Sequence, residues 1–381
     1  MSTTGPTPLR ELALLFFRLG ATSFGGPAAH VAMMQDEVVE RRRWLDEQRF
    51  LDLVSATNLI PGPNSTELAI HIGHARRGWA GLVVSGLAFL TPAVALTALL
   101  AWAYVAHGGL PEVAWLLFGI KPVILAIVAH AIWKLAPRAL KTWPLRWLGA
   151  AALAACFAGV HELAVLFGAG LFATARTAFG SGASFAGVVR EGGAAAAIGA
   201  GSALASSVTL PSLFFVFLKI GSVLFGSGYV LLAFLRTDLV ERLGWITEAQ
   251  LVDAIAAGQV TPGPVFSSAT FLGWLLAGPA GAALATLGIF LPAFVFVALS
   301  LPLVPRLRAS SSVSAFLDGL NVASLALMVW VTVELGRGAL VDALTVVLAI
   351  VSALLVFSTR VNSTWIVLGG AAASFAVHAL R

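Results

Sequence analysis

Hydrophobic positions along this chain run in long continuous stretches instead of alternating with polar ones. Four stretches follow one another in the first half and four in the second: about 79–105, 113–136, 145–159 and 162–177, then about 279–302, 314–336, 340–357 and 363–380. Stretches that approach roughly 20 apolar residues have the length of a membrane-crossing helix. A β-barrel would show short alternating segments instead. The pattern therefore predicts an all-α polytopic membrane protein.

The first half opens with a helical run that is broken once. The apolar run from Leu9 to Ser23 is interrupted by Phe24-Gly25-Gly26-Pro27, and a helical pattern then continues from Ala28 to Arg41. Proline fits the first turn of a helix, so Pro27 suits the point of resumption. We expect a first helix that breaks and then continues.

The next segment contains a tripeptide, Pro61-Gly62-Pro63, that cannot lie inside a continuous helix. Each proline lacks a backbone donor and clashes with the preceding turn. The 46–58 segment before it is amphipathic, with Asp46 as the expected N-cap, and the 64–75 segment after it is short. Neither segment can cross a bilayer alone. Together they predict a re-entrant helical hairpin with the tripeptide at its tip, buried in protein or lining a cavity.

This arrangement occurs twice. Residues 18–63 align with 219–264 without a gap at an offset of 201, and fourteen of the 46 pairs are identical, the Pro-Gly-Pro included. After the break the offset becomes 200, and Gly73/Gly273, Pro92/Pro292 and Gly119/Gly319 still match. Matched Gly, Pro, Trp and acidic residues are a stronger signal than shared apolar ones. We expect a first repeat at 9–178, a linker at 179–209 and a second repeat at 210–381.

The linker is rich in Gly, Ala and Ser, which is typical of a flexible connection. Within it, 194–208 is a candidate for an additional membrane segment.

Loop charges indicate that the two halves are inverted. Arg76 and Arg77 precede the long stretch of the first half, whereas the equivalent 276–281 loop carries no Lys or Arg. At the far end of that stretch the bias reverses, because Arg306 and Arg308 occur only in the second half. Cytoplasmic loops are enriched in Lys and Arg, so opposite bias in equivalent loops predicts an inverted repeat. A parallel repeat is the alternative.

Three consecutive arginines at 41–43 place that end of the first helix in the cytoplasm. Ten full crossings, with both termini outside, satisfy the loop charges.

Composition agrees with this assignment. The chain is 59% hydrophobic and 11% charged, and its mean hydropathy is +0.93. The net charge of +5 comes from Lys and Arg that fall mostly in short loops, so it needs no nucleic acid partner. Cys156 is the only cysteine, which excludes a disulfide within one chain. The run after Leu9 is not followed by a cleavage site, so we expect no cleaved signal peptide.

Each half supplies two helix starts that follow a break. A helix start carries partial positive charge and free N–H groups, which bind anions. In inverted halves these starts can converge near the middle of the bilayer. The residues we expect to bind substrate are two matched cations, neutral polar residues and the breaks themselves: Arg18, Ser23, Gly25, Gly26, Asn58, Pro61, Gly62, Pro63, Asn64, Ser65, Thr66, Lys219, Gly226, Ser227, Gln259, Thr261, Pro262, Gly263 and Pro264.

Such groups suit a small, doubly charged oxyanion. A metal cation would require carboxylates or histidines at ligand spacing. Simpler accounts exist for several of these residues, since Gly and Pro are common in membrane helices and Ser and Thr often satisfy freed backbone groups. Arg18 and Lys219 could instead extend to the membrane surface.

Three acidic residues are candidates for proton coupling. Asp52 and Asp253 lie on the amphipathic segments that lead to the breaks, and Glu67 follows the first break. Glu67 also fits as an acid favoured in the first turn of a helix. His71 and His74 have no third ligand nearby, so we expect no metal site and no cofactor.

The break motifs resemble the chromate ion transporter family, long two-domain type. The resemblance rests on Phe24-Gly25-Gly26-Pro27, the 35–44 segment and 58–64 in the first half, and on 225–228 and 259–264 in the second. The motif positions carried over are Gly25, Gly26, Pro27, Asn58, Pro61, Gly62, Pro63 and Asn64, then Gly226, Gly228, Gln259, Pro262, Gly263 and Pro264.

The resemblance implies a multi-pass protein of the bacterial inner membrane that exports chromate, confers resistance to it and is coupled to the proton gradient. It also implies sulfate as a structural analogue. The second half departs from the first at Ser227 and Val265, so the two half-sites are unequal. We therefore expect the first break to contact substrate and the second to serve more as scaffold or gate.

The leading hypothesis is a secondary transporter, not an enzyme, whose partners are the oxyanion, the lipid bilayer and, as a candidate, a second copy of the chain. The alternatives are transport of sulfate or another small anion, and hydrolysis of a lipid phosphate within the membrane. The last would need a nucleophile and base clustered near a break, and no such cluster occurs there.

Overall fold

The computed structural model describes residues 7–23, 27–107, 111–180, 207–225, 230–301, 310–359, 361 and 363–380. Within these ranges the protein is helical and has no strand. The first half contains α1 (Leu9–Thr22), α2 (Pro27–Gln35), the π-helix η1 (Asp36–Arg41), α3 (Glu47–Thr57), α4 (Asn64–His107), α5 (Pro111–Ala139), α6 (Trp143–Phe157) and α7 (Glu162–Gly180). The second contains α9 (Leu210–Val223), α10 (Leu231–Leu235), the π-helix η3 (Arg236–Arg242), α11 (Glu248–Val260), the 3-10 turn η4 (Val265–Ser267), α12 (Ser268–Ser300), α14 (Ser311–Ala339), α15 (Ala343–Ser358) and α16 (Ser363–Ala379).

Among the described residues, four helices are long and apolar enough to cross a membrane. They are Asn64–His107, Trp115–Ala139, Val265–Ser300 and Ser312–Ala339. Several shorter apolar helices accompany them, including α9, α15 and α16. The protein is therefore a multi-pass membrane protein. The linker prediction falls mostly on residues 181–206, and the candidate segment at 194–208 therefore lies largely outside the described residues.

Local capping follows the sequence pattern. Asp46 accepts a hydrogen bond from the Arg49 backbone N–H at 2.7 Å, and Thr247 forms a capping box with Gln250 at the start of α11. These contacts satisfy backbone donors that the first turn of a helix leaves free. The predicted start of the amphipathic helix at Asp46 is confirmed, and the equivalent helix of the second half is capped in the same way.

The first helix of each half is broken as predicted, but the second piece doubles back instead of continuing in the same direction. Glu11 near the start of α1 lies 2.5 Å from Arg42, one residue beyond η1, and Arg18 pairs with Glu37. In one continuous helix, residues 11 and 42 would be about 46 Å apart. The two pieces therefore run antiparallel, and opposite charges bridge them.

This geometry also corrects the expected position of the start of α1. Glu11 and Arg42 are in contact, so the start of α1 lies on the same side of the protein as Arg42 and the arginines next to it. The expectation that this end of α1 and these arginines lie on opposite sides is wrong. Residues 24–26 lie outside the described ranges.

A second sharp turn lies inside α4 and α12. Arg77 and Gly78 leave the helical conformation, with φ of −145° and 58°, and Ala277 and Gly278 do the same. The Thr270 and Thr286 hydroxyls, 16 residues apart, lie at 2.7 Å, whereas a straight helix would separate them by about 24 Å. Each long helix is thus a short arm folded back onto a long arm.

Glycine allows the two arms to touch. A Cβ built on Gly73 would lie 2.3 Å from the Gly81 carbonyl oxygen, and Gly273 meets Gly281 in the same way. Small residues of this kind let membrane helices approach backbone to backbone. The same spacing in both halves explains why these glycines match.

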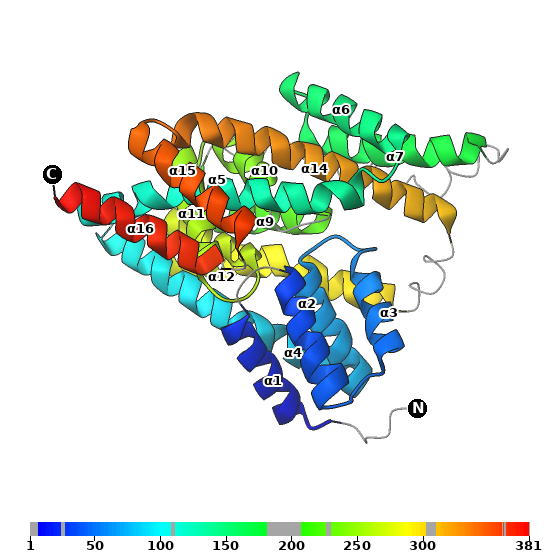
Figure 1. The fold of residues 1–381 in the computed structure, drawn as a ribbon. Coiled ribbons are helices and arrows are strands. Elements are labelled where there is room, and N and C mark those ends of the chain that lie inside the picture. Colours follow the sequence, from blue (N-terminus) through cyan, green and yellow to red (C-terminus); the bar gives the residue numbers. More distant parts are fainter. Residues whose placement is uncertain are drawn as a thin grey trace.

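The halves are interlocked. Within each half the first helix packs against the long hairpin, α1 on α4 and α9 on α12. Helix α5 packs against α15 and α16 of the second half, whereas α14 packs against α6 and α7 of the first. Figure 1 shows α5 beside α15, and α14 beside α6 and α7. Most of the packing of α5 and α14 is therefore exchanged between the halves.

Candidate functional site

The two Pro-Gly-Pro breaks each contact the end of a first helix in the opposite half. The Gly62 N–H donates to the Leu224 carbonyl at 2.8 Å, and the Gly263 N–H donates to the Ser23 carbonyl at 2.9 Å. Leu224 and Ser23 are equivalent residues, each the C-cap of its helix. The two hydrogen bonds are therefore the same contact made in both directions.

Both central glycines have positive φ, 138° at Gly62 and 97° at Gly263. Other residues rarely adopt this conformation. A Cβ at Gly263 would lie 2.9 Å from the Ala93 side chain, and one at Gly62 would lie 3.6 Å from that of Ala293. Each break thus rests on the long hairpin of the other half, one residue past Pro92 or Pro292.

The two hydrogen bonds bring together several of the predicted substrate-binding residues. Ser23, Gly62 and Gly263 take part directly, and the flanking prolines at 61, 63, 262 and 264 are buried beside them. The predicted positions Gly25, Gly26, Gly226 and Ser227 lie outside the described residues.

Polar groups follow the first break. The Asn64 amide donates to the Asn58 side-chain oxygen at 2.8 Å, with Asn58 exposed and Asn64 half-buried. Ser65 and Thr66 are buried, and the Thr66 hydroxyl has no hydrogen-bond partner among the described residues. Two amides, one at the end of α3 and one at the start of α4, thus lie nearer the surface than the two hydroxyls that follow in α4.

Glu67 lies one turn into α4 and is 0% exposed. Neither of its carboxylate oxygens has a hydrogen-bond partner in the described part of the chain. His71, one further turn along, is 1% exposed, and both of its ring nitrogens are also without a partner there. Buried polar groups are nearly always hydrogen-bonded. Two consecutive exceptions mark this stretch as unusual.

At the second break most polar groups are satisfied. Thr97 of the first half lies 3.1 Å from Ser267 and 3.4 Å from Thr261, and Thr261 also donates to backbone carbonyls of α11. The exception is the Gln259 amide nitrogen, which is buried without a partner within the described ranges. The second break is thus tied to the first half by hydroxyl contacts.

Arg18 and Lys219 are both paired with acids. Arg18 contacts Glu37, and Lys219 lies 2.7 Å from Asp238, the equivalent residue. Further arginines reach each acid: Arg42 at 3.2 Å and Arg41 at 3.5 Å from Glu37, and Arg242 at 3.0 Å from Asp238. Each acid lies on a π-helix, η1 or η3, and π-helical turns are often found at functional sites.

Sequence reasoning missed these two acids. Glu37 and Asp238 are separated by the same offset of 201 but are not identical, so a search for identical pairs omits them. A comparison of the two halves that counted any two acidic residues at the offset of 201 as a match would have found them. Asp238 is 0% exposed, which makes it the more deeply buried of the two.

The equivalent acids Asp52 and Asp253 have different surroundings. Asp52 is half-buried and accepts a hydrogen bond from Gln48 at 3.2 Å. Asp253 is buried, accepts from the Tyr104 hydroxyl at 3.0 Å and lies 3.9 Å from the Lys121 ammonium. Asp253 therefore joins α11 to α4 and α5 of the first half.

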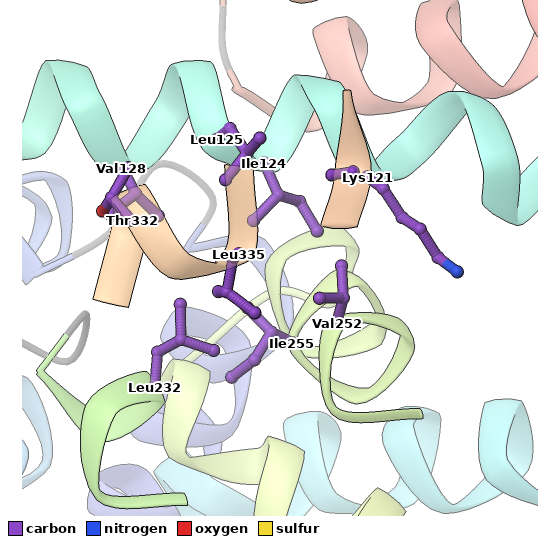
Figure 2. Close-up of a pocket in the computed structure, with 10 residues that line it drawn as sticks. Lys121, Ile124, Leu125, Val128, Leu232, Val252, Ile255, Thr332 and Leu335 are labelled. Atoms are coloured by element: carbon purple, nitrogen blue, oxygen red, sulfur yellow. The ribbon is translucent and has the colours of Figure 1, made fainter. Parts of the chain in front are cut away.

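A small pocket lies near this last contact, between α5, α14 and the second-half helices α10 and α11. Its lining is apolar apart from Lys121 and Thr332. Figure 2 shows the Lys121 side chain extending away from the apolar residues, so its amine does not line the pocket interior. This pocket lacks the donors that an oxyanion requires, and it does not include either break.

Paired breaks inside a multi-pass helical repeat are a feature of one class, the membrane transport proteins. A family model described as chromate transporter matches residues 10–174 and again residues 211–375, which together make up most of the chain. The chain therefore belongs to the chromate transporter family.

Relatives match over nearly the full length. The chromate transport protein of Cupriavidus metallidurans is 31% identical over 97% of this chain and 93% of its own. The chromate transport protein of Pseudomonas aeruginosa is 31% identical over 92% and 87%. The probable chromate transport protein of Synechococcus elongatus is 28% identical over 90% and 88%. No solved structure matches the chain at a significant level.

Proposed function

We propose that this protein is a secondary transporter that exports chromate, or a closely related tetrahedral dianion, across the bacterial inner membrane. The observation that carries the proposal is the reciprocal pair of hydrogen bonds, Gly62 to Leu224 and Gly263 to Ser23. Broken helices that meet inside a membrane protein form substrate sites, because irregular backbone there must be buried or line a cavity. The names of the relatives supply the substrate class.

In this proposal the halves are an inverted repeat, and α3 with the short arm of α4 forms a re-entrant hairpin. The reciprocal contacts between equivalent residues support a two-fold relation of the halves, and the opposite Lys and Arg bias of equivalent loops supports the inverted form of it. The doubled-back first helix adds a second hairpin in each half. The C-cap residues Ser23 and Leu224 then meet the breaks of the opposite halves in two pairs, and rocking of one half against the other exposes the site alternately to each side.

The substrate-binding groups in this proposal lie mainly at the first break. The start of α4 offers backbone N–H groups and a helix dipole, and Asn58 and Asn64 offer side-chain amides. From the second half, the Gln259 amide is a buried donor whose partner is not among the described residues. Thr261 and Ser267 are already bonded to Thr97, which fits a scaffold role for the second break.

Transport of labelled chromate tests the proposal directly. Inverted membrane vesicles that contain the protein should accumulate chromate when a proton-motive force is imposed, and empty vesicles should not. Cells that express the protein should retain less chromate than cells that do not. Absence of accumulation under every imposed gradient would reject the function. Competition by sulfate in the same assay separates a chromate-selective site from a general dianion site.

Orientation is tested separately by cysteine labelling. Single cysteines placed in equivalent loops, at 78 and at 278, should react with a membrane-impermeant reagent from opposite sides. Labelling of both from the same side would establish a parallel repeat and reject the inverted arrangement.

A further inference from the structure

One stretch of α4 remains without an explanation in the proposed binding site. Glu67 and His71 are four residues apart, so they lie on the same face of the helix. Both are almost wholly buried, and none of their four polar side-chain atoms has a hydrogen-bond partner among the described residues. A charged carboxylate in such a place has lost its hydration without gaining a compensating contact. A bound proton removes that charge.

Glu67 is in direct contact with the break. A Cβ at Gly62 would lie 2.3 Å from the Glu67 carboxylate oxygen, so the carboxylate occupies the space beside the glycine backbone. The same glycine donates its N–H to Leu224 of the opposite half. Any change at the Glu67 carboxylate therefore acts on the residue that joins the two halves.

The second half has no counterpart. At the offset of 200, Ser267 and Phe271 take the places of Glu67 and His71. Ser267 is bonded to Thr97, and at the second break the nearest contact of Gly263 is the Ala93 methyl group. The unpartnered acid and imidazole thus belong to one break only.

Few charged groups surround this stretch. His74, one turn along α4, and Arg49 on α3 interact electrostatically with His71. The elements packed on α4 also carry charged or titratable residues: Arg10, Glu11 and Arg18 on α1, His30 on α2, Glu47 and Asp52 on α3, and Glu248 and Asp253 on α11. Of these, Glu11, Arg18, Glu248 and Asp253 form ion pairs with residues other than Glu67, and His30 is bonded to the Ser23 carbonyl. Helix α12 carries no charged or titratable residue at all. Within the described ranges Glu67 therefore has neither a hydrogen bond nor an ion pair.

The position of Glu67 determines whether it strengthens or weakens the binding of an anion at the start of α4. Glu67 lies in the first turn of α4, where the free N–H groups and the helix dipole attract negative charge. An ionised Glu67 offsets part of the positive potential at the helix start and repels a dianion bound there. A protonated Glu67 does neither. We infer that Glu67 and His71 form a proton-binding site whose proton binds together with the anion, so that each raises the affinity for the other.

This inference rests on the proposed function and specifies that the proton and chromate cross the membrane in the same direction. A transporter whose two ligands bind together carries both the same way. Export of one dianion with one proton moves a single net negative charge outward. The membrane potential, negative inside, then drives export, while the pH component of the proton-motive force opposes it.

The test uses purified full-length protein in proteoliposomes that enclose a pH-sensitive dye. Chromate is applied over the alkaline range in which it stays fully dianionic, under a potassium diffusion potential. We expect protons to move in the same direction as chromate, and chromate affinity to rise by up to about tenfold per unit fall in pH, the limit for one linked proton. Replacing Na⁺ by choline should change nothing.

The variant Glu67→Gln, which imitates the neutral acid, should bind chromate with an affinity independent of pH and should move no protons. Glu334→Gln on α14 is the matched control, since Glu334 pairs with Arg337 far along the chain, and it should behave like the wild type. Asp52→Asn and Asp253→Asn compare the other candidate acids and should keep the proton flux.

The outcomes separate the two proposals. If the wild type moves no chromate, the proposed function fails and this inference with it. If chromate moves but protons run opposite to it, if Na⁺ is required, or if Glu67→Gln keeps the wild-type proton flux, only the inference is overturned. If Glu67→Gln cannot be recovered in folded form, the direction of proton flux in the wild type alone decides whether protons and chromate move together.

Discussion

At the scale of single residues, the missing side chain of Gly62 matters most. Its φ of 138° suits glycine, and the Glu67 carboxylate fills the space where a Cβ would lie. Gly78 also has positive φ, but a Cβ there would meet nothing within 4 Å. The two glycines therefore share backbone strain and differ in contact, which makes them a matched pair.

We expect Gly62→Ala to abolish chromate transport and Gly78→Ala to retain much of it. Both substitutions carry a backbone penalty of about 1–3 kcal/mol, but only the first displaces Glu67 and the junction with Leu224. Thermal unfolding and chromate uptake, measured on both variants, check this. Equal loss of transport in the two variants would reduce the effect at Gly62 to general instability.

The second residue-scale prediction concerns Lys219 and Asp238. Asp238 has no exposed side-chain surface, so Asp238→Asn leaves Lys219 and Arg242 without their acid and should lower the free energy of unfolding by about 3–5 kcal/mol. The double variant Lys219→Gln/Asp238→Asn should recover part of that loss.

Unfolding of the single and double variants in detergent measures the coupling, and Arg18→Gln/Glu37→Gln is the equivalent pair in the first half. If the double variant is no more stable than Asp238→Asn, the Lys219–Asp238 ion pair does not stabilise the packing of α9 against η3. If the stable double variant still binds chromate weakly, Lys219 also contacts the substrate.

Single residues also show what a sequence can and cannot predict. The caps Asp46 and Thr247 were predictable, because a cap depends on neighbours within four residues. The partners of Arg18 and Lys219 were not, because they lie 19 residues further along, across a turn whose direction the sequence leaves open. The burial of Glu67 depends on packing against other helices and was equally out of reach.

At the scale of elements, the breaks decide how the helices are arranged. The prolines at 61 and 63 would each cost about 3 kcal/mol inside a helix, so α3 ends before them and α4 begins after them. The sequence predicted this break, and the repeat offset confirmed its importance. It did not predict that α1 and α2 run antiparallel, because a Gly-Gly-Pro break permits both a kink and a full reversal.

Replacement of Pro61-Gly62-Pro63 by three alanines should let α3 continue into α4. We expect this variant to reach the membrane but to lose transport, because the continued helix removes both the helix start and the Gly62 junction. The same replacement at Pro262-Gly263-Pro264 serves as the comparison. Protection of cells from chromate by the first variant would move the substrate site away from the break.

At the scale of the whole molecule, neither half covers its own α5 or α14 helix. Helix α5 lies against α15 and α16, and α14 lies against α6 and α7. The backbones meet closely, since a Cβ at Gly119 would be 2.2 Å from the Gly370 carbonyl oxygen, and one at Gly319 would be 2.4 Å from that of Ala169. The repeat was evident in the sequence, but this exchange was not. The apolar pattern of α5 would be satisfied equally by α6 and α7 of its own half or by α15 and α16 of the other.

We therefore expect two separate chains, divided within the 181–206 segment, to restore transport only when they are expressed together. Each half alone leaves an apolar face of α5 or α14 uncovered and should be degraded. Chromate resistance of cells that carry one half, both halves or the intact chain measures this. Full resistance from a single half would contradict the exchanged packing.

The exchange also bears on how such a chain could arise. A half-length ancestor could cover its own version of α5 only with the last two helices of a second, identical molecule. Duplication and fusion of one gene would then have preserved contacts that already existed between two subunits, with the linker added afterwards. The small glycines at 119 and 319, which admit the neighbouring backbone, would be remnants of that older interface between subunits.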